Sequence, residues 1–318
     1  MPKLLISYVL PEPNLRSLAE HFTLIYPTES SSFTYEEIFH HVVEADAYLA
    51  VNHLVDQPTL ERGKKLKMIA NYGVGYDGID VEYATQRGIV VTNTPTAVTE
   101  ATAEAAFGLM LSLMRNITFC DRQLRHNQDF VWGMLQAHTG HSLYGKTLGI
   151  IGLGRIGRAV ARRAVAFGMT VLYYQRSPLF DPLTREFGAT YCSLNDLLQK
   201  SDVVSLHVPL NDSTHHLLGE QELSLMRSTA FLINTARGPV IDEQALIAQL
   251  EEGQLAGAAL DVFEEEPHIP EALLRMDKVV LTPHIGTETI EARLAMGYEA
   301  ERNLVAFFAG NRPPNVVN

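Results

Sequence analysis

Short apolar runs alternate with amphipathic stretches along most of the 318-residue chain. This alternation is typical of βαβ units, in which parallel strands form a sheet and the connecting helices cover its two faces. We therefore predict an α/β fold built from doubly wound parallel sheets. The predicted strands are residues 4–9, 47–51, 68–71, 88–92, 148–152, 170–174, 203–207, 230–234, 257–260 and 279–282. The predicted helices are residues 14–21, 35–44, 81–87, 155–167, 194–200, 220–226 and 243–253.

Two α/β segments can be separated along the chain. The first is followed by an alanine-rich helix, residues 98–116, whose apolar residues lie on more than one face. Such a helix should be buried, and it could lie between two domains. Residues 289–308 form a final helix that has no strand of its own. If this helix packs back on the first segment, the domains are residues 1–100 with 287–318, and residues 101–286.

The composition and net charge of the chain argue against some classes of binding partner. Lys and Arg number 25 and Asp and Glu number 37, so the net charge is −12 with neutral His. An acidic chain is a poor general binder of nucleic acid or of an anionic membrane. No apolar stretch approaches the ~20 residues of a membrane helix, and no secretory signal opens the chain. Cys120 and Cys192 are too few for a disulfide framework, so we expect a cytoplasmic protein.

A glycine-rich turn connects the strand at residues 148–152 to the helix that follows it. Gly152, Gly154 and Gly157 have the G-x-G-x-x-G spacing. In this setting the glycines permit a tight turn, a close approach of backbone to a pyrophosphate, and close packing of helix on strand. The N–H groups at the helix start then bind the phosphates. The pattern predicts a dinucleotide site, and a tight turn without a ligand is the alternative.

The end of the next strand bears on the choice between NAD and NADP. NAD enzymes usually carry Asp or Glu there, which accepts a hydrogen bond from the ribose 2′-OH. Here the strand ends Tyr174-Gln175-Arg176-Ser177, without a carboxylate. Arg176 and the Ser177 hydroxyl could bind a 2′-phosphate, so the sequence favours NADP. Alternatively, Arg176 stacks on the adenine or faces solvent, and the cofactor is NAD.

Four later strands each end in an ionisable residue. They are His207, Arg237, the acidic stretch from Asp261 to Glu266, and His284. Because ligands of parallel sheets bind beyond the carboxyl ends of the strands, these residues should lie along one edge. Each alone could be a surface charge or a buried structural group. Together they could reduce a ketone: His donates the proton, a carboxylate favours the imidazolium, and Arg binds the carboxylate of a 2-oxo acid.

Further motifs surround these residues. They are Val74-Gly75-Tyr76-Asp77-Gly78-Ile79-Asp80, Asn93-Thr94-Pro95, Thr99-Glu100-Ala101-Thr102-Ala103-Glu104, Asn234-Thr235-Ala236-Arg237-Gly238, Asp261-Val262-Phe263-Glu264-Glu265-Glu266-Pro267 and Pro283-His284-Ile285-Gly286. With the glycine loop, they make nearly the whole chain resemble the D-isomer-specific 2-hydroxyacid dehydrogenase family. The resemblance implies two Rossmann-like domains, one flavodoxin-like and one dinucleotide-binding, with a cleft between them. Residues 1–100 with 287–318 would then bind substrate, and residues 101–286 would bind the dinucleotide.

The resemblance also implies roles for single residues. His284 would be the acid/base, Glu266 its partner, and Arg237 the substrate-binding arginine, while the backbone of Val74 and Gly75 would cradle the substrate carboxylate. No metal is implied. The implied cofactor contacts are Thr102, Leu153, Gly154, Arg155, Ile156, Gln175, Arg176, Ser177, His207, Pro209, Thr235, Ala236, Asp261, His284 and Gly286.

The resemblance further implies a homodimer and closure of the cleft over substrate. The Gln-Arg-Ser sequence at residues 175–177 is similar to that of NADP-using glyoxylate/hydroxypyruvate reductases. One departure lies in residues 125–134, where related reductases often have a glycine and two tryptophans, one of which can cap a partner's active site. Trp132 is the only tryptophan here. The loops at residues 52–54, which include Asn52, and at residues 71–76 could line the substrate pocket, as could a partner's Trp132 or Met134. The identity of the substrate is therefore left open.

Three functions follow in order of preference. The first is NAD(P)H-dependent reduction of a small 2-oxo acid, such as glyoxylate or hydroxypyruvate, to the D-2-hydroxy acid. The second is an NAD-linked dehydrogenase of the D-lactate or phosphoglycerate type. The third is a nucleotide-sensing interaction protein resembling the transcriptional co-repressors of the same fold. The third ranks far lower, because the Arg–Glu–His set is intact and no peptide-binding extension is evident.

Overall fold

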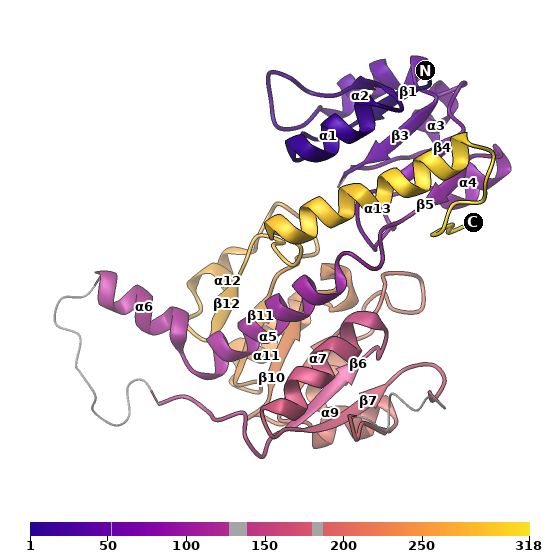
Figure 1. Cartoon of the computed structure of the whole chain (residues 1–318). Helices are drawn as coiled ribbons and strands as arrows, with labels where there is room; N and C mark the ends of the chain where they lie inside the picture. Colours follow the sequence, from indigo (N-terminus) through magenta and orange to yellow (C-terminus); the bar gives the residue numbers. More distant parts are fainter. Residues whose placement is uncertain (52, 127–138, 180–186) are drawn as a thin grey trace. The chain divides into compact units, whose positions relative to one another are not determined.

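The computed structural model describes residues 1–51, 53–126, 139–179 and 187–318 (Figure 1). The chain divides into two compact units. Unit 1 consists of residues 1–98 and 287–318, and unit 2 of residues 99–286. The sequence predicted the first boundary after residue 100, and the contacts in the structure divide the chain after residue 98. Both divide it again after residue 286. No helix in the described ranges is long and apolar enough to cross a membrane.

Unit 1 contains a five-stranded parallel sheet with the strand order β2-β1-β3-β4-β5. This is the flavodoxin-like order. The strands are β1 (Lys3–Ile6), β2 (Thr23–Ile25), β3 (Ala47–Ala50), β4 (Met68–Asn71) and β5 (Val90–Thr92). The helices are α1 (Glu12–Ala19), α2 (Tyr35–His41), η1 (Val42–Glu44), α3 (Gln57–Arg62), α4 (Val81–Gln86) and α13 (Ile290–Phe308).

Helices cover both faces of this sheet. Alternate strand residues such as Leu5, Tyr48 and Ile69 pack in one core with α2, α3 and α4. On the other side, α13 contacts β4 and α1, so the last long helix belongs to the first unit, as Figure 1 shows. Helix α13 begins where the Thr289 side chain accepts a hydrogen bond from the amide of Ala292, a normal N-cap.

Unit 2 contains a seven-stranded parallel sheet with the order β12-β11-β10-β9-β6-β7-β8. This is the dinucleotide-binding order extended by one strand. The strands are β6 (Thr147–Ile151), β7 (Thr170–Tyr174), β8 (Thr190–Tyr191), β9 (Val203–Leu206), β10 (Phe231–Asn234), β11 (Gly257–Leu260) and β12 (Val279–Leu281). The helices are α5 (Thr99–Met114), α6 (Ile117–His126), α7 (Arg155–Ala166), α9 (Leu194–Lys200), α10 (Glu220–Ser224), η2 (Gly238–Val240), α11 (Glu243–Glu251) and α12 (Glu271–Arg275).

Two cores lie on opposite faces of the second sheet. One joins α5 and α7 to the sheet through residues such as Met110, Val160 and Ile150. The other joins α9, α10 and α11 to it through residues such as Leu198 and Leu232. Helix α5 packs on α7 and on β10, β11 and β12, so its apolar circumference is buried within unit 2. The predicted α/β fold with two doubly wound parallel sheets is confirmed.

Several short elements were not predicted. They are β2, β8, α3, α6, α12 and η2. The predicted helix at residues 98–116 ends at Met114, and the chain turns at Asn116, whose φ of 55° is left-handed. Amphipathic α6 then begins at Ile117. The missed strands span only two or three residues, too few for a periodic pattern.

Candidate active site

The strand order of unit 2 reverses between β6 and β9, which are neighbours in space. In open parallel sheets, the crevice beyond the carboxyl ends at such a point is where ligands bind. Gly152 follows β6 and His207 follows β9. The amide of His207 donates a 2.8 Å hydrogen bond to the carbonyl of Ile151, so the two strand ends stay paired up to this point.

The three glycines of the loop occupy three different environments. Gly152 has φ 94°, and a Cβ there would lie 2.5 Å from the carbonyl oxygen of His207. A Cβ on Gly157 would lie 2.2 Å from the carbonyl oxygen of Gly152, so α7 packs directly on the turn. Gly154 is the N-cap of α7, and a Cβ there would meet no described atom within 4 Å. The backbone of Gly154 is therefore open to a close-lying ligand, next to helix N–H groups that no side chain caps.

Two polar side chains near this crevice stand out, His207 and Thr235. His207 is held by the Ser205 hydroxyl, whose Oγ lies 2.9 Å from Nε2. Burial lowers the pKa of His207 to about 4, so the ring is neutral at physiological pH. The Thr235 hydroxyl is buried and has no hydrogen-bond partner among the described residues. An orphaned buried hydroxyl is unusual, and a bound polar ligand would satisfy it.

The end of β7 is exposed where the sequence predicts the 2′-phosphate site. The Gln175 side-chain amide donates a 2.7 Å hydrogen bond to the carbonyl of Ser177, which fixes a short turn after the strand. Arg176 and Ser177 are both exposed on this turn. A guanidinium and a hydroxyl are therefore exposed to solvent at the end of β7, and residues 175–177 include no carboxylate.

His284 and Glu266 form a hydrogen-bonded pair at the same sheet edge. Nδ1 of His284 lies 2.8 Å from Oε2 of Glu266, and both side chains are about one-third exposed. The other carboxylate oxygen of Glu266 accepts a 3.1 Å hydrogen bond from the Phe263 amide. Burial raises the pKa of Glu266, but His284, the Phe263 amide and the charge of Arg237 together hold it below its ordinary value. Glu266 is therefore ionised at neutral pH, and the imidazole Nε2 is left for other partners.

Asp261 holds the turn that carries His284. Its carboxylate is buried and accepts hydrogen bonds from the Thr282 hydroxyl at 2.6 Å and from the amides of Ile285 and Gly286 at 2.8 Å each. These bonds keep His284 in a left-handed conformation with φ 53°. The Thr102 side chain lies against Gly286, because a Cβ there would be 3.5 Å from Thr102 Cγ2. Thus the side chain of Asp261 is committed largely to positioning the turn.

The Arg237 loop is fixed by two residues that the sequence analysis gave no role. The Asn234 side chain donates to the carbonyl of Arg237 at 2.9 Å and accepts from the amide of Ala236 at 3.0 Å. A Cβ on Gly238 would lie only 1.9 Å from the carbonyl of Phe263. Glycine at 238 therefore lets the Arg237 loop approach the segment that carries Glu266. The only signal in the sequence was their place in the motif at residues 234–238.

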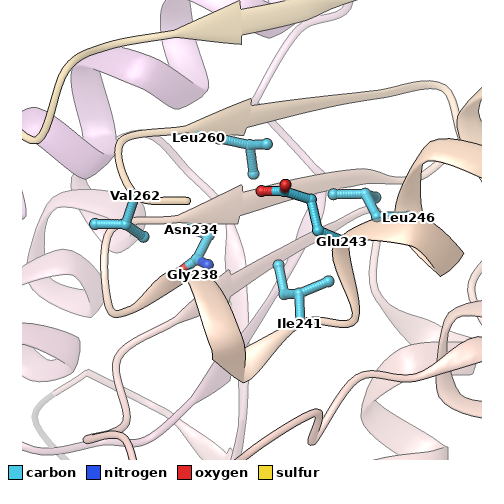
Figure 2. A pocket seen from close by; sticks show the side chains of 7 residues that line it. All are labelled: Asn234, Gly238, Ile241, Glu243, Leu246, Leu260 and Val262. Carbon is cyan, nitrogen blue, oxygen red and sulfur yellow. The ribbon is translucent and has the colours of Figure 1, made fainter. Parts of the chain in front are cut away.

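A small cavity lies behind this loop (Figure 2). The Glu243 side chain points into it from the start of α11, and Asn234 and Gly238 line the opposite side. Burial raises the pKa of Glu243, and the carboxylate accepts a 3.3 Å hydrogen bond from the Glu264 amide. A volume near 10 Å³ holds at most one water, so this cavity supports the loop and is too small for a substrate.

The carbonyl groups of the Val74–Gly75 loop in unit 1 accept hydrogen bonds from two asparagine side chains. The Asn71 side chain donates to the carbonyls of Gly73 and Gly75, at 2.9 and 2.8 Å. The Asn93 side chain donates to the carbonyl of Val74 at 2.9 Å. Within the described ranges, the amides of Val74 and Gly75 donate no hydrogen bond. Successive unpaired N–H groups form a concave anion-binding surface.

The residues of unit 2 fit a dinucleotide. The open backbone at Gly154, the uncapped start of α7 and the orphaned Thr235 hydroxyl all lie on the loops that follow β6 and β10. Each is a donor or a space that phosphate, ribose or amide groups would fill. The described part of the chain contains no group of three His, Cys, Asp or Glu residues suited to a metal ion.

Comparisons with known proteins identify the family. The model of the NAD binding domain of D-isomer specific 2-hydroxyacid dehydrogenases matches residues 107–286. A glyoxylate reductase from Pyrococcus furiosus is 45% identical over 100% of this chain and 95% of its own length. The chain belongs to the D-isomer-specific 2-hydroxyacid dehydrogenase family.

Solved structures of similar proteins agree with this membership in the D-2-hydroxyacid dehydrogenases. A Thermus thermophilus protein superposes with a TM-score of 0.91 at 39% identity, covering 99% of this chain and 100% of that one. An NADPH-dependent glyoxylate/hydroxypyruvate reductase from Sinorhizobium meliloti, in complex with NADP and malonate, has a TM-score of 0.88 at 34% identity. That match covers 99% of this chain and 96% of the other.

The predicted site residues of this dehydrogenase can now be sorted by their observed setting. Unit 2 brings Arg237, Glu266 and His284 together at one sheet edge, and Leu153, Gly154, Arg155 and Ile156 form the turn into α7. Pro209 lies two residues beyond His207, and its carbonyl accepts a hydrogen bond from the Thr214 hydroxyl. Val74 and Gly75 lie in unit 1. Asn52, Trp132 and Met134 lie outside the described residues, so the pocket-lining predictions that involve them stay predictions.

Proposed function

We propose that this protein reduces a small 2-oxo acid of the glyoxylate or hydroxypyruvate type to the D-2-hydroxy acid, with NADPH as the preferred reductant. The observation that carries the proposal is the hydrogen bond between His284 and Glu266, with Arg237 close enough to lower the pKa of Glu266. These three groups supply a proton donor, a partner that stabilises its charged form, and a carboxylate-binding cation. The names of the relatives, glyoxylate reductases and a glyoxylate/hydroxypyruvate reductase, support the substrate class.

In this proposal His284 donates a proton to the oxygen of the substrate carbonyl. The bound reduced nicotinamide supplies the hydride that adds to the carbonyl carbon. The ionised Glu266 orients the imidazole through Nδ1 and stabilises the imidazolium, leaving Nε2–H to face the substrate oxygen. In the reverse direction, neutral His284 accepts the proton of the hydroxyl group.

Two groups would bind the substrate carboxylate. The Arg237 guanidinium can make two parallel hydrogen bonds to it, an arrangement that favours a planar 2-oxo acid over a simple ketone. In unit 1, the amides of Val74 and Gly75 would be backbone donors to a carboxylate, as the family resemblance implies, since the carbonyls of that loop are held by Asn71 and Asn93.

The dinucleotide would lie along the carboxyl edge of the sheet in unit 2. The N–H groups from Gly154 to Ile156, with Leu153 and Arg155 beside them, would bind the pyrophosphate. Gln175, Arg176 and Ser177 would contact the adenosine ribose, and Arg176 with Ser177 would bind a 2′-phosphate. Thr102, His207, Pro209, Thr235, Ala236, Asp261 and Gly286 would line the remaining length. The exposed guanidinium and the missing carboxylate favour NADP over NAD.

Assembly and location complete the proposal. We infer a homodimer from the family, to be measured by sedimentation equilibrium with and without NADPH. A cytoplasmic location agrees with two free cysteines, Cys120 and Cys192. Neither inference affects the chemistry proposed for His284.

The decisive experiment is an initial-rate screen of 2-oxo acids with NADPH and with NADH, followed by absorbance at the nicotinamide band. Glyoxylate and hydroxypyruvate should be the preferred substrates, and NADPH should give the higher kcat/KM. Pyruvate and phosphohydroxypyruvate serve as the controls for the lactate and phosphoglycerate alternatives. An absence of turnover with every acid and both cofactors would refute the proposal.

A further inference from the structure

Asn303 of α13 connects two distant segments of unit 1 to each other. Its side chain is completely buried in the middle of the helix. The amide nitrogen donates a 3.1 Å hydrogen bond to the carbonyl of Asn93, and the amide oxygen accepts a 3.1 Å hydrogen bond from the Asn315 amide. Asn93 and Asn315 are themselves joined, since the Asn93 amide donates to the Asn315 carbonyl at 3.2 Å. A buried side chain with both polar atoms satisfied in this way fixes the backbone of residue 93.

Asn93 passes this constraint on to the loop at residues 73–75. Its own side chain donates to the carbonyl of Val74 at 2.9 Å, and the next amide, that of Thr94, donates to the carbonyl of Gly73 at 3.0 Å. The peptide of Val74 is therefore oriented by Asn93, which is oriented by Asn303. The N–H groups on the other side of this loop take their direction from the same peptide planes.

We propose that Asn303 is a positioning residue for the substrate carboxylate, acting through Asn93 on the amides of Val74 and Gly75. The inference rests on the proposed role of that loop in binding the carboxylate. Without Asn303, the carbonyl of Asn93 and the amide of Asn315 lose their buried partner, and the loop amides no longer point in one direction. Substrate affinity falls, whereas the chemistry at His284 is untouched.

The first test compares Asn303→Ala with Asn14→Ala as a matched control. Asn14 is also fully buried and also hydrogen-bonds to α13, through the carbonyl of Leu294 at 3.1 Å, but it has no link to the loop. Asn303→Ala should raise the KM for glyoxylate about three- to tenfold, the loss expected for one net hydrogen bond, with kcat and the KM for NADPH little changed. Asn14→Ala should lower the melting temperature and leave the KM for glyoxylate unchanged. Equal KM effects of the two variants would overturn the inference.

The second test is a double-mutant cycle, which a merely structural role would not satisfy. If Asn303 acts through Asn93, Asn93→Ala should raise the KM for glyoxylate, and adding Asn303→Ala should raise it by clearly less than the product of the two single effects, since only the backbone contact of Thr94 with Gly73 remains to be disturbed. Multiplicative effects would mean that the two residues act independently, against the inference. Asn303→Leu is nearly isosteric, adds no buried charge and also removes the donor to Asn93, so it should reproduce the KM effect if the alanine variant is too unstable to assay.

Oxalate binding separates this inference from the proposed function. Oxalate carries the carboxylate of a 2-oxo acid and needs no turnover, so calorimetry on the NADP-loaded enzyme measures the carboxylate site alone. Weaker oxalate binding by Asn303→Ala than by Asn14→Ala supports the positioning role even if the wild-type enzyme reduces neither glyoxylate nor hydroxypyruvate. Active wild-type enzyme with equal oxalate affinity in both variants refutes the positioning role alone.

Discussion

The Nδ1 atom of His284 lies 2.8 Å from Oε2 of Glu266, and Oε1 of the same carboxylate accepts the amide of Phe263. Glu266 is thus anchored to its own backbone segment while it holds the imidazole. On the other side, Asp261 fixes the turn around His284 through the amides of Ile285 and Gly286. The ring is therefore oriented by two carboxylates, one bonded to the side chain and one to the turn.

Replacing His284 tests its role as proton donor. His284→Asn keeps a side chain of similar polarity but cannot transfer a proton near neutral pH. We expect kcat for glyoxylate reduction to fall by about 10²–10⁴-fold, the usual contribution of a general acid. NADPH binding, followed by fluorescence titration, should be largely retained. A variant with near-normal turnover would remove His284 from the mechanism.

Replacing Glu266 tests the partnership. In Glu266→Gln the neutral amide stabilises a protonated imidazole less than the carboxylate does. The rate of reduction should therefore begin to fall at a lower pH than in the wild type, and kcat/KM at pH 7 should drop. The pH profile of kcat/KM measures this directly. Glu265→Gln is the control, because Glu265 is a chain neighbour without that hydrogen bond, and identical profiles for both variants would contradict the pairing.

Arg176 is expected to set the cofactor preference. Arg176→Ala removes the exposed guanidinium at the end of β7 and leaves the glycine loop intact. The KM for NADPH should rise by about one to two powers of ten, and the KM for NADH should change little. Steady-state kinetics with each cofactor at saturating glyoxylate gives both values. An unchanged KM for NADPH would favour NAD as the natural cofactor.

Gly238 is expected to tolerate no side chain. A Cβ at this position would lie 1.9 Å from the carbonyl of Phe263, so Gly238→Ala must displace backbone that carries Arg237 or Glu266. We expect a loss of about 2 kcal/mol or more in the free energy of unfolding, together with most of the activity. Gly108→Ala is the matched control, because a Cβ there meets no described atom within 4 Å. It should stabilise α5 by roughly 0.5–1 kcal/mol and preserve activity.

Burial of His207 makes an acid-sensitive contribution to stability. Its folded pKa of about 4 lies below the ordinary 6.5, so the unfolded chain binds a proton in this window and the folded chain does not. Stability present above pH 6.5 is therefore lost as the pH falls toward 4, by up to about 3 kcal/mol. His207→Gln removes this dependence. The difference in unfolding free energy between wild type and variant, from urea titrations at pH 7 and pH 4, should change by that amount, and a constant difference would contradict it.

The sequence carried enough periodicity to predict the fold and not enough to predict its short elements. The strand at residues 68–71 and the helix at residues 194–200 agree with β4 and α9 residue for residue, because apolar runs and clear caps bound them. Strand β8 consists of Thr190 and Tyr191, both exposed, and owes its existence to pairing with β7. Two residues are too few for a sequence pattern that could predict such a pairing.

The sequence alone could assign a site role only where residue type determines chemistry. His284 and Arg237 were assigned roles because their side chains transfer protons or carry charge, and the family resemblance singled out Glu266 from its acidic neighbours. Their catalytic roles stay predictions. Asn234, Gly238 and Asn303 were not given a role, because an amide or a missing Cβ acquires its function only from what approaches it in three dimensions. Asp261 combines the two situations. The sequence predicted it as a cofactor contact, whereas in the structure its carboxylate accepts hydrogen bonds from the turn at residues 282–286.

The placement of α13 in unit 1 has a consequence for the order of events on the ribosome. The first strands emerge early, but the helix that contacts β4 and α1 is translated only after all of unit 2. Unit 2 is one continuous stretch and can close its sheet as soon as residue 286 is free of the exit tunnel. Until α13 emerges, the part of the first sheet that it covers keeps its apolar residues exposed. Chaperones should therefore be needed longest by the N-terminal part of the nascent chain, which is synthesised first but completed last.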